Sequence, residues 1–250
     1  MLKKIKISAV SYQNTIPFLY GIENSEFIDR NTCVSLDIPS ECARKLLDNE
    51  VDIGLIPIAI LPLLEKYTII SDYCIGAEGD VKTVLLLSEV PLNEIERVYL
   101  DYQSRTSVNL LIVLAKHFWQ INPVFKHARP GYEDEISGTT AGVVIGDRCF
   151  SLKNKYKYVY DLSGEWTKFT NLPFVFACWV ANKELDATFV EQFNSALKFG
   201  IEHITESIAN YSNHLLNDEE LLSYLKNDIK FLFDDKKRQG LNLFLDYLNK

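Results

Sequence analysis

Short apolar stretches alternate with amphipathic helical stretches over about the first 181 residues of the chain. The apolar stretches are expected to form strands at residues 4–10, 32–38, 52–56, 68–74, 83–88, 98–100, 124–127, 141–146, 158–162 and 174–181. Between them, apolar residues recur at the three- and four-residue spacing of a helix with one buried face. This alternation predicts an α/β fold with mainly parallel sheets.

The rest of the chain is expected to be helical, with helices at residues 186–210, 218–226 and 235–248. No glycine- or serine-rich linker marks a domain boundary. Two short apolar strands, residues 83–88 and 174–181, are instead the candidates for segments that cross between domains. They predict a first domain of residues 1–86 and 178–250 and a second domain of residues 87–177.

The clearest local motif is a strand, a polar turn and a helix over residues 97–118. The hydroxyl of Ser104 or Thr106 can accept a hydrogen bond from an N–H of the first helical turn. Arg105 adds a positive charge at the same end, and Ser107 adds a further hydroxyl. Such a turn suits a carboxylate or a phosphate. The alternative is a capped helix whose arginine lies in solvent, since most capped helices bind nothing.

Other polar residues follow expected strands in the same way. Ser11, Tyr12 and Asn14 lie in the turn between the first strand and the next helix. Asp101 and Asp147 each come directly after a later strand. Open α/β sheets place their binding sites at the carboxyl ends of strands. Each aspartate can equally cap a helix, and both interpretations stay open.

Composition narrows the class of protein. Of the 250 residues, 47% are hydrophobic and 24% are charged, a balance typical of a globular protein with a packed core. The formal net charge is -8 and no long basic block is present, so a nucleic-acid partner is not expected. No secretory signal or membrane span is recognisable, so we expect a cytoplasmic protein without a membrane partner.

The residues that usually bind metals or cofactors show no suitable spacing. The 5 cysteines include no C-x-x-C pair and are expected to be reduced, mostly buried thiols. The 4 histidines lack metal-ligand spacing, so no metal site is expected. The glycine-rich motifs of nucleotide-binding proteins and the G-x-S-x-G motif of α/β-hydrolases are absent. No cofactor is therefore expected.

Six motifs recur in a fixed order over about three quarters of the chain. They are SYQNTIPF at 11–18, DIGLIPIAIL at 52–61, VKTVLLLSEVP at 81–91, LDYQSRTS at 100–107, VVIGD at 143–147 and EWTKFTNLPFVFACW at 165–179. Each motif alone is weak. Together, in this order and spacing, they resemble the chorismate dehydratases of menaquinone biosynthesis by the futalosine pathway.

The resemblance implies a type II periplasmic-binding-protein-like fold. In that fold two α/β lobes are joined by two crossing strands and the ligand lies between the lobes; here a helical C-terminal tail would follow. It also implies a hydro-lyase reaction, in which chorismate loses water to give 3-enolpyruvyloxybenzoate. Such a site has to hold two carboxylates, exclude water and assist the departure of hydroxide. No base is evident in the motifs, and the resemblance suggests proton removal by the enolpyruvyl carboxylate of the substrate itself.

The resemblance assigns catalytic roles to Asn14 and Thr83, whose amide and hydroxyl stay uncharged near neutral pH. The family usually has serine where this chain has Thr83, and threonine keeps the hydroxyl. The expected substrate-binding residues are Ser11, Tyr12, Pro57, Ser104, Arg105, Thr106, Ser107 and Asp147. Without the resemblance, Asn14 would be interpreted as a helix cap or a turn residue and Thr83 as a packed strand residue.

Two other functions stay open. The first is the sister enzyme of the same pathway, 1,4-dihydroxy-6-naphthoate synthase, which is expected to use a histidine. His117 and His127 lie in no motif that we recognise as catalytic. The second is a cytoplasmic solute-binding protein that captures a small anion. The expected partner is the small molecule chorismate, and a homodimer is left open.

Overall fold

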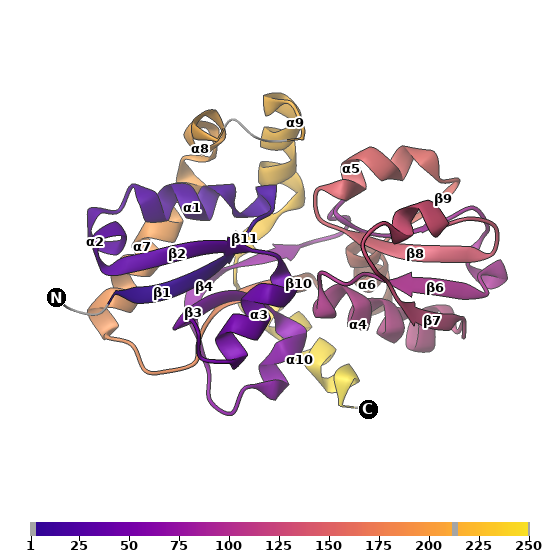
Figure 1. Cartoon of the computed structure of the whole chain (residues 1–250), viewed down its shortest axis with the longest axis horizontal. Helices are drawn as coiled ribbons and strands as arrows, with labels where there is room; N and C mark the ends of the chain where they lie inside the picture. Colours follow the sequence, from indigo (N-terminus) through magenta and orange to yellow (C-terminus); the bar gives the residue numbers. More distant parts are fainter. Residues whose placement is uncertain (1–3, 212–214, 250) are drawn as a thin grey trace. The chain divides into compact units, whose positions relative to one another are not determined.

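The chain forms two compact units, each built around one sheet, in a computed structural model that describes residues 4–211 and 215–249 (Figure 1). Unit 1 comprises Met1–Gly76 and Val175–Asp235, and unit 2 comprises Ala77–Phe174 and Lys236–Lys250. Both sheets contain parallel and antiparallel strand pairs. The expectation of mainly parallel sheets is therefore wrong, although the α/β class is confirmed.

Unit 1 has a six-stranded sheet in the described part of the chain, with the strand order β11-β4-β10-β3-β1-β2. Its strands are β1 (Ile5–Val10), β2 (Thr32–Asp37), β3 (Ile53–Pro57), β4 (Thr68–Ala77), β10 (Phe174–Ala181) and β11 (Lys230–Leu232). β1 pairs in parallel with β2 and β3, whereas β10 is antiparallel to β3 and β11 is antiparallel to β4. The carboxyl ends of β1, β2 and β3 consequently lie at one edge of the sheet.

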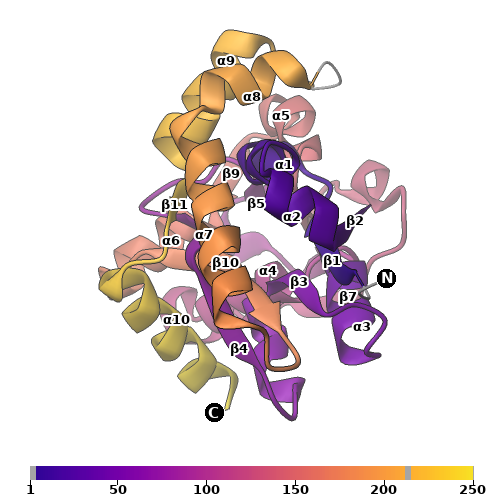
Figure 2. The same cartoon turned by 90° about the vertical axis from the view of Figure 1, so that its left-hand side faces the viewer.

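Unit 1 contains six α-helices among the described residues. They are α1 (Ile16–Glu23), α2 (Glu26–Asn31), α3 (Pro39–Leu47), α7 (Ala187–Glu202), α8 (Ile204–Asn210) and α9 (Asp218–Ser223). The ring of Trp179 on β10 lies 5.7 Å from Phe18 of α1 and 5.2 Å from Phe193 of α7. Both helices therefore contact the same strand, and they pack closely against each other where Gly21 of α1 meets Gly200 of α7. In Figure 2, α7 is seen in front of the sheet.

Unit 2 has a five-stranded sheet among the described residues, with the strand order β7-β6-β8-β5-β9. Its strands are β5 (Val84–Ser88), β6 (Arg97–Leu100), β7 (Val124–His127), β8 (Thr140–Ile145) and β9 (Tyr158–Asp161). β6 is parallel to β7 and β8, and β5 is antiparallel to β8 and β9. The beginning of β5 thus lies beside the ends of β8 and β9.

The C-terminal helix completes the core of unit 2. The helices of this unit are α4 (Arg105–Leu114), α5 (Arg148–Leu152), α6 (Leu162–Thr170) and α10 (Asp235–Leu248). Trp166 of α6 is fully buried, with ring centroids 5.4 Å from Phe174 and 6.0 Å from Phe244 of α10. Gly240 lets α10 approach the backbone of Pro173, because an added Cβ would lie 2.2 Å from its carbonyl oxygen.

The unit boundaries differ from those expected from the sequence. Residues 77–86 and 236–250 belong to unit 2, and residues 175–177 belong to unit 1. The strand expected to cross at residues 83–88 is β5, which lies inside the sheet of unit 2. The chain instead passes between the units within β4, within β10 and at the start of α10. An apolar pattern does not distinguish a crossing strand from a central one, since both are buried on both faces. That each unit is an independent domain stays a prediction.

Several elements also differ from the expected ones. The helix expected at residues 186–210 breaks at His203, whose φ of -117° and ψ of 40° are not helical, so α7 and α8 are separate. The C-terminal third is not wholly helical, because β11 joins the edge of the first sheet. The segment after Pro57 forms a 3-10 helix, Ile58–Leu63, that contains Pro62. Proline lacks the N–H that a continuing α-helix needs.

Two further expectations concern the whole chain. In the described ranges, no helix combines the length and apolar character needed to cross a membrane. All five cysteines are free and four of them are buried, as expected. The expected cytoplasmic location stays a prediction.

The close packing of α1 on α7 can be tested with Gly200→Ala. A Cβ at this position would lie 1.8 Å from the carbonyl oxygen of Pro17, so the helices would have to move apart. We expect the free energy of unfolding in urea to fall by about 1–3 kcal/mol. Lys198→Ala, at an exposed position of the same helix, is the matched control. A stability gain of about 1 kcal/mol in Gly200→Ala, as helix propensity alone would give, would contradict this packing.

Candidate functional site

The strand pairing in unit 2 brings several predicted site residues to one edge of its sheet. The turn after β6 and the turn after β8 lie at the same edge because these strands are parallel. β5 runs the other way and starts there, with Val84 opposite Ile145. The N–H of Gly146 donates to the carbonyl of Thr83 at 2.9 Å. Neighbouring strands therefore carry Thr83, Asp147 and the turn of residues 101–104 between β6 and α4, which we call the Ser104 turn.

The turn before α4 has the capping arrangement expected from the sequence. Ser104 is the N-cap, and its hydroxyl accepts from the N–H of Ser107 at 3.4 Å and from the Ser107 hydroxyl at 3.3 Å. Ser104, Thr106 and Ser107 are buried, whereas Arg105 is exposed. The positive end of the helix dipole, a guanidinium and three hydroxyls thus lie within four consecutive residues, a combination suited to an anion.

The buried carboxylate of Asp101 holds this turn in place by hydrogen bonds. The Asp101 side chain is fully buried and accepts from the N–H of Gln103 at 2.7 Å and from the Tyr132 hydroxyl at 2.8 Å. The Arg148 guanidinium lies 2.5 Å from the same carboxylate and also contacts Glu133. Burial raises the pKa of Asp101, and the hydrogen bonds and the positive charge of Arg148 only partly offset it. Asp101 is therefore committed to holding the Ser104 turn and α5 together.

The carboxyl ends of β1 and β2 form the corresponding edge in unit 1. The N–H of Ser11 donates to the carbonyl of Asp37 at 2.9 Å. This bond attaches the turn after β1 to the last residue of β2. A 3-10 helix, Gln13–Thr15, then leads into α1. Asn14 is 9% exposed, and its Oδ1 accepts from the Thr15 hydroxyl at 3.3 Å. The Asn14 amide is thus oriented, at least in part, by its neighbour.

The remaining predicted residues are placed less specifically. Tyr12 is partly buried and its carbonyl accepts from the N–H of Thr15 at 3.0 Å. Pro57 is the last residue of β3, where it is buried beside Ala177 of β10. Asp147 precedes α5 and makes no side-chain capping bond to it. The capping alternative for Asp147 is therefore wrong, and its role as a site residue stays a prediction.

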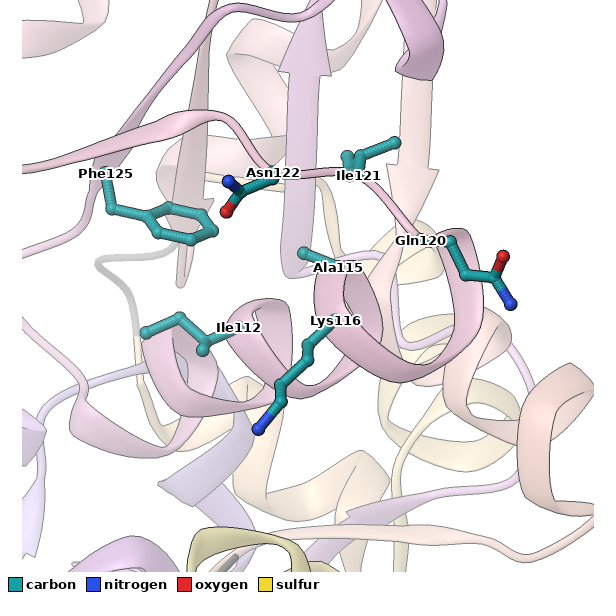
Figure 3. A pocket seen from close by; sticks show the side chains of 7 residues that line it. All are labelled: Ile112, Ala115, Lys116, Gln120, Ile121, Asn122 and Phe125. Atoms are coloured by element: carbon teal, nitrogen blue, oxygen red, sulfur yellow. The ribbon is translucent and has the colours of Figure 1, made fainter.

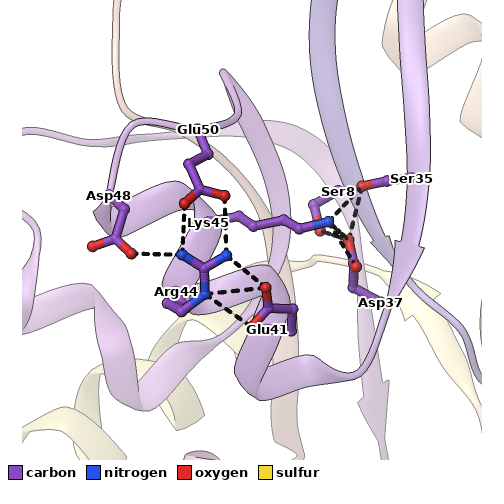
Figure 4. A network of polar contacts seen from close by, with 8 residues as sticks. All are labelled: Ser8, Ser35, Asp37, Glu41, Arg44, Lys45, Asp48 and Glu50. Atoms are coloured by element: carbon purple, nitrogen blue, oxygen red, sulfur yellow. Dashed lines mark hydrogen bonds and ion pairs between the residues drawn. The ribbon is translucent and has the colours of Figure 1, made fainter.

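A second polar network lies near the end of β2 (Figure 4). The Asp37 carboxylate accepts from the Ser8 hydroxyl at 2.7 Å and the Ser35 hydroxyl at 2.8 Å, and both of its oxygens lie 2.7 Å from the Lys45 ammonium. Burial alone would raise the pKa of Asp37, but the bonds from Lys45, Ser8 and Ser35 outweigh it and lower the pKa. This network fixes the strand end from which Ser11 is held.

Two cavities, one in each unit, lie away from these residues. One of about 480 Å³ lies at the carboxyl end of α4, opposite the Ser104 turn (Figure 3). It is lined by Ile112, Ala115, Lys116, Gln120, Ile121, Asn122 and Phe125. Another of about 380 Å³ in unit 1 is lined by Leu47, Asn49, Leu63, Leu64, Glu65, Lys66 and Asn182. Neither contains a predicted site residue.

Sequence reasoning missed the residues that hold the site residues in place. Asp37 is the last residue of β2, and a carboxylate at a strand end was the available signal. Its partners Lys45, Ser8 and Ser35 carry no motif. The same holds for Asp161, whose carboxylate binds the segment before Thr83. Among the described residues, no group of three histidine, cysteine or carboxylate side chains could hold a metal ion.

Solved structures of low sequence identity match almost the whole chain and show its fold. A protein of Archaeoglobus fulgidus has a TM-score of 0.76 and 15% identity, covering 98% of this chain and 97% of its own. A Candida albicans protein with the generic periplasmic binding protein fold has a TM-score of 0.61 and 15% identity, covering 99% and 95%. The chain thus has a periplasmic-binding-protein-like fold, two-lobed and mixed α/β, as expected.

Sequence comparison identifies the family within this class. A family model described as menaquinone biosynthesis matches residues 5–250. A chorismate dehydratase of Thermus thermophilus is 26% identical over 231 residues, which are 84% of this chain and 84% of that protein. The chain belongs to the menaquinone biosynthesis family.

The support that Arg148 gives to Asp101 can be tested with Arg148→Met. This change leaves a buried carboxylate without its cation, which typically costs 3–5 kcal/mol. Because the Arg148 side chain is 26% exposed, water can partly replace it, and we expect a loss of about 2–3 kcal/mol in the free energy of unfolding. Arg97→Met, at an exposed position of β6, is the control.

The loss in Arg148→Met should depend on pH in a defined direction. The pKa of Asp101 is raised in the folded protein, and without Arg148 it rises further. A raised carboxyl pKa destabilises the fold as pH increases from about 4 through the folded-state pKa, because ionisation is then easier in the unfolded chain. Urea unfolding should therefore show a smaller loss at about pH 5 than at about pH 8. An equal loss at both would mean that Arg148 acts by packing alone.

Proposed function

We propose that the protein is a hydro-lyase that dehydrates chorismate to 3-enolpyruvyloxybenzoate in menaquinone biosynthesis by the futalosine pathway. The observation that carries the proposal is the match to a chorismate dehydratase over 84% of both chains. Membership of the menaquinone biosynthesis family supports it. The Ser104 turn of unit 2 is consistent with a substrate that carries a carboxylate.

The proposed reaction needs little chemistry from the protein. The ring carbon that bears the enolpyruvyl ether loses a proton, and the neighbouring carbon loses its hydroxyl as water forms. The electron pair of the broken C–H bond completes the aromatic ring, which supplies the driving force. The enolpyruvyl carboxylate of the substrate takes the proton. The protein then contributes position, charge stabilisation of the leaving hydroxide and exclusion of water.

Two sets of residues would divide this work. The Ser104 turn with Arg105, Thr106 and Ser107 would hold a substrate carboxylate, because a helix amino terminus and a guanidinium both favour an anion. Ser11, Tyr12, Pro57 and Asp147 would complete the substrate contacts. Asn14 and Thr83 would orient and stabilise the departing hydroxyl, since an amide and a hydroxyl both donate hydrogen bonds.

One incubation distinguishes the candidate reactions. Purified protein is mixed with chorismate, and the products are followed by ultraviolet absorbance and mass spectrometry. A product that has lost one water, with new aromatic absorbance, supports the dehydratase. Unchanged chorismate with an increased melting temperature would instead indicate a binding protein. Turnover of a cyclic futalosine to a dihydroxynaphthoate, without turnover of chorismate, would indicate the sister enzyme.

The catalytic roles are tested with Asn14→Ala and Thr83→Val. Each removes a hydrogen-bonding group, and we expect kcat to fall by about a hundredfold or more, as for lost donors to a developing anion. Thermal melts should change little, because neither side chain anchors the core. Steady-state turnover of chorismate is the measurement.

Matched variants separate these roles from local packing. Thr83→Ser keeps the hydroxyl and should keep activity. Asn24→Ala changes the asparagine at the other end of α1, whose amide donates to the Tyr20 carbonyl at 2.8 Å, and should also keep activity. Parent-like kcat in both Asn14→Ala and Thr83→Val would overturn the assignment of these residues.

The anion-binding role is tested with Arg105→Ala. Losing a charge-assisted hydrogen bond to a substrate carboxylate should raise KM or lower kcat/KM by about tenfold or more. The effect should weaken with added salt, because Arg105 is exposed and its charge is screened. Arg97→Ala, at the start of the strand that leads to the same turn, is the control. If both variants keep the parent kinetics, Arg105 does not contact the substrate.

A further inference from the structure

Three backbone N–H groups of the segment that leads into Thr83 donate hydrogen bonds to the side chains of Asp161, the N-cap of α6, and Thr167 within α6. The N–H groups of Val81 and Lys82 both donate to Oδ2 of Asp161, at 2.9 and 2.6 Å. Two residues earlier, the N–H of Gly79 donates to the Thr167 hydroxyl at 3.2 Å. The segment is thereby fixed at three successive points before β5 begins.

The second oxygen of the same carboxylate caps α6. Oδ1 of Asp161 accepts from the N–H of Ser163 at 3.0 Å and of Gly164 at 3.2 Å. Asp161 thus accepts from four backbone N–H groups, two on each oxygen. Each oxygen has two lone pairs, so the carboxylate joins the helix to the segment with both oxygens fully used.

The held segment has an unfavourable backbone that fixes the direction of Thr83. Lys82 has a φ of 66°, in the left-handed region that residues other than glycine rarely adopt. The hydroxyl of the following residue, Thr83, donates to the Val81 carbonyl at 3.5 Å. The two bonds to Asp161 offset the cost of the Lys82 conformation, and without them the segment is expected to relax and turn the Thr83 hydroxyl away.

We propose that Asp161 is a positioning residue for Thr83 in the dehydration of chorismate, acting through the backbone of Val81 and Lys82. The proposal rests on the proposed function. Asp161 acts through the backbone and is given no substrate contact of its own. The position of the Thr83 hydroxyl then depends on an ionisable group, although neither Thr83 nor Asn14 titrates near neutral pH.

The electrostatic surroundings set the pH at which this support is lost. Burial raises the pKa of Asp161 to about 6, the four N–H groups oppose the rise, and the nearby charge of Asp80 adds to it. Lys168 and Cys149 also interact electrostatically with Asp161. Below about pH 6 one carboxyl oxygen of Asp161 carries a proton and becomes a hydrogen-bond donor. It then faces the N–H groups from which it accepted before, and two donors cannot bond to each other. Either the cap or the bonds to the segment must break.

The key variant is Asp161→Asn. Asparagine is a good helix cap, so its oxygen can keep the bonds to Ser163 and Gly164. Its NH2 group would then face the N–H groups of Val81 and Lys82, where donor meets donor. Asp161→Ser keeps a capping hydroxyl and removes the second oxygen without adding a donor, so it serves if the asparagine variant does not fold.

The matched control is Asp186→Asn. Asp186 caps α7 by accepting from the N–H of Phe189 at 3.2 Å and is exposed. It lies in unit 1, so the change tests the loss of a capping carboxylate without touching the Thr83 segment. Thermal melts of all variants show whether each protein is folded at the assay temperature.

The experiment measures kcat and KM for chorismate from about pH 5 to pH 8 in the parent chain and the variants. We expect the kcat of the parent to fall as pH decreases through about 6, as the Asp161 carboxylate is protonated. Asp161→Asn and Asp161→Ser should have kcat lowered about tenfold or more above that pH, with KM little changed and this pH step lost. Amide hydrogen exchange at Val81 and Lys82 should become about tenfold faster or more.

The outcomes separate the two proposals. If the parent does not dehydrate chorismate, the proposed function fails and the role of Asp161 in it fails as well. If the parent is active but both Asp161 variants keep its kcat and its pH step, the positioning role alone is overturned. It is also overturned if kcat falls while exchange at Val81 and Lys82 is unchanged. Asp186→Asn should match the parent in kcat, pH profile and exchange at these two amides.

Discussion

In unit 2, β6 and β8 run parallel while β5 runs against them, and this pairing decides where every polar candidate of the unit lies. The turns after β6 and β8 emerge at one edge, and β5 starts there, so Thr83 is joined to Gly146 by a backbone bond. A register shift of one residue would turn each strand residue to the opposite face. Unit 1 has the same arrangement, with the Ser11 turn bound to the end of β2.

Local signals explain what could be predicted from the sequence. The Ser104 cap, the polar turns at strand ends and the limits of α10 depend on residues close together in the chain, so a single sequence contains them. The pair of Asp101 with Arg148 joins residues 47 positions apart, and the position of α10 in unit 2 depends on an aromatic contact between Trp166 and Phe244. No local pattern contains these contacts.

Three buried or partly buried carboxylates support the candidate residues in different ways. Asp37 is held by Lys45 and two hydroxyls, and its pKa is lowered. Asp101 also has a cation, yet its pKa is raised, because its side chain is 0% exposed whereas that of Asp37 is 13% exposed. Asp161 is held by backbone N–H groups, and burial outweighs them. The depth of burial therefore decides the direction more than the presence of a cation does.

In the proposed reaction, two of these carboxylates, Asp101 and Asp161, influence the rate through the positions of other side chains. A substrate that carries its own base leaves the protein with groups that do not titrate near neutral pH, so the rate depends on their position. Asp161 sets the backbone before Thr83, and Asp101 accepts from Gln103 in the turn before Ser104. Both have raised pKa values. Acid would then reduce activity by releasing the segment before Thr83 from Asp161, and this pH dependence would belong to the scaffold of the site.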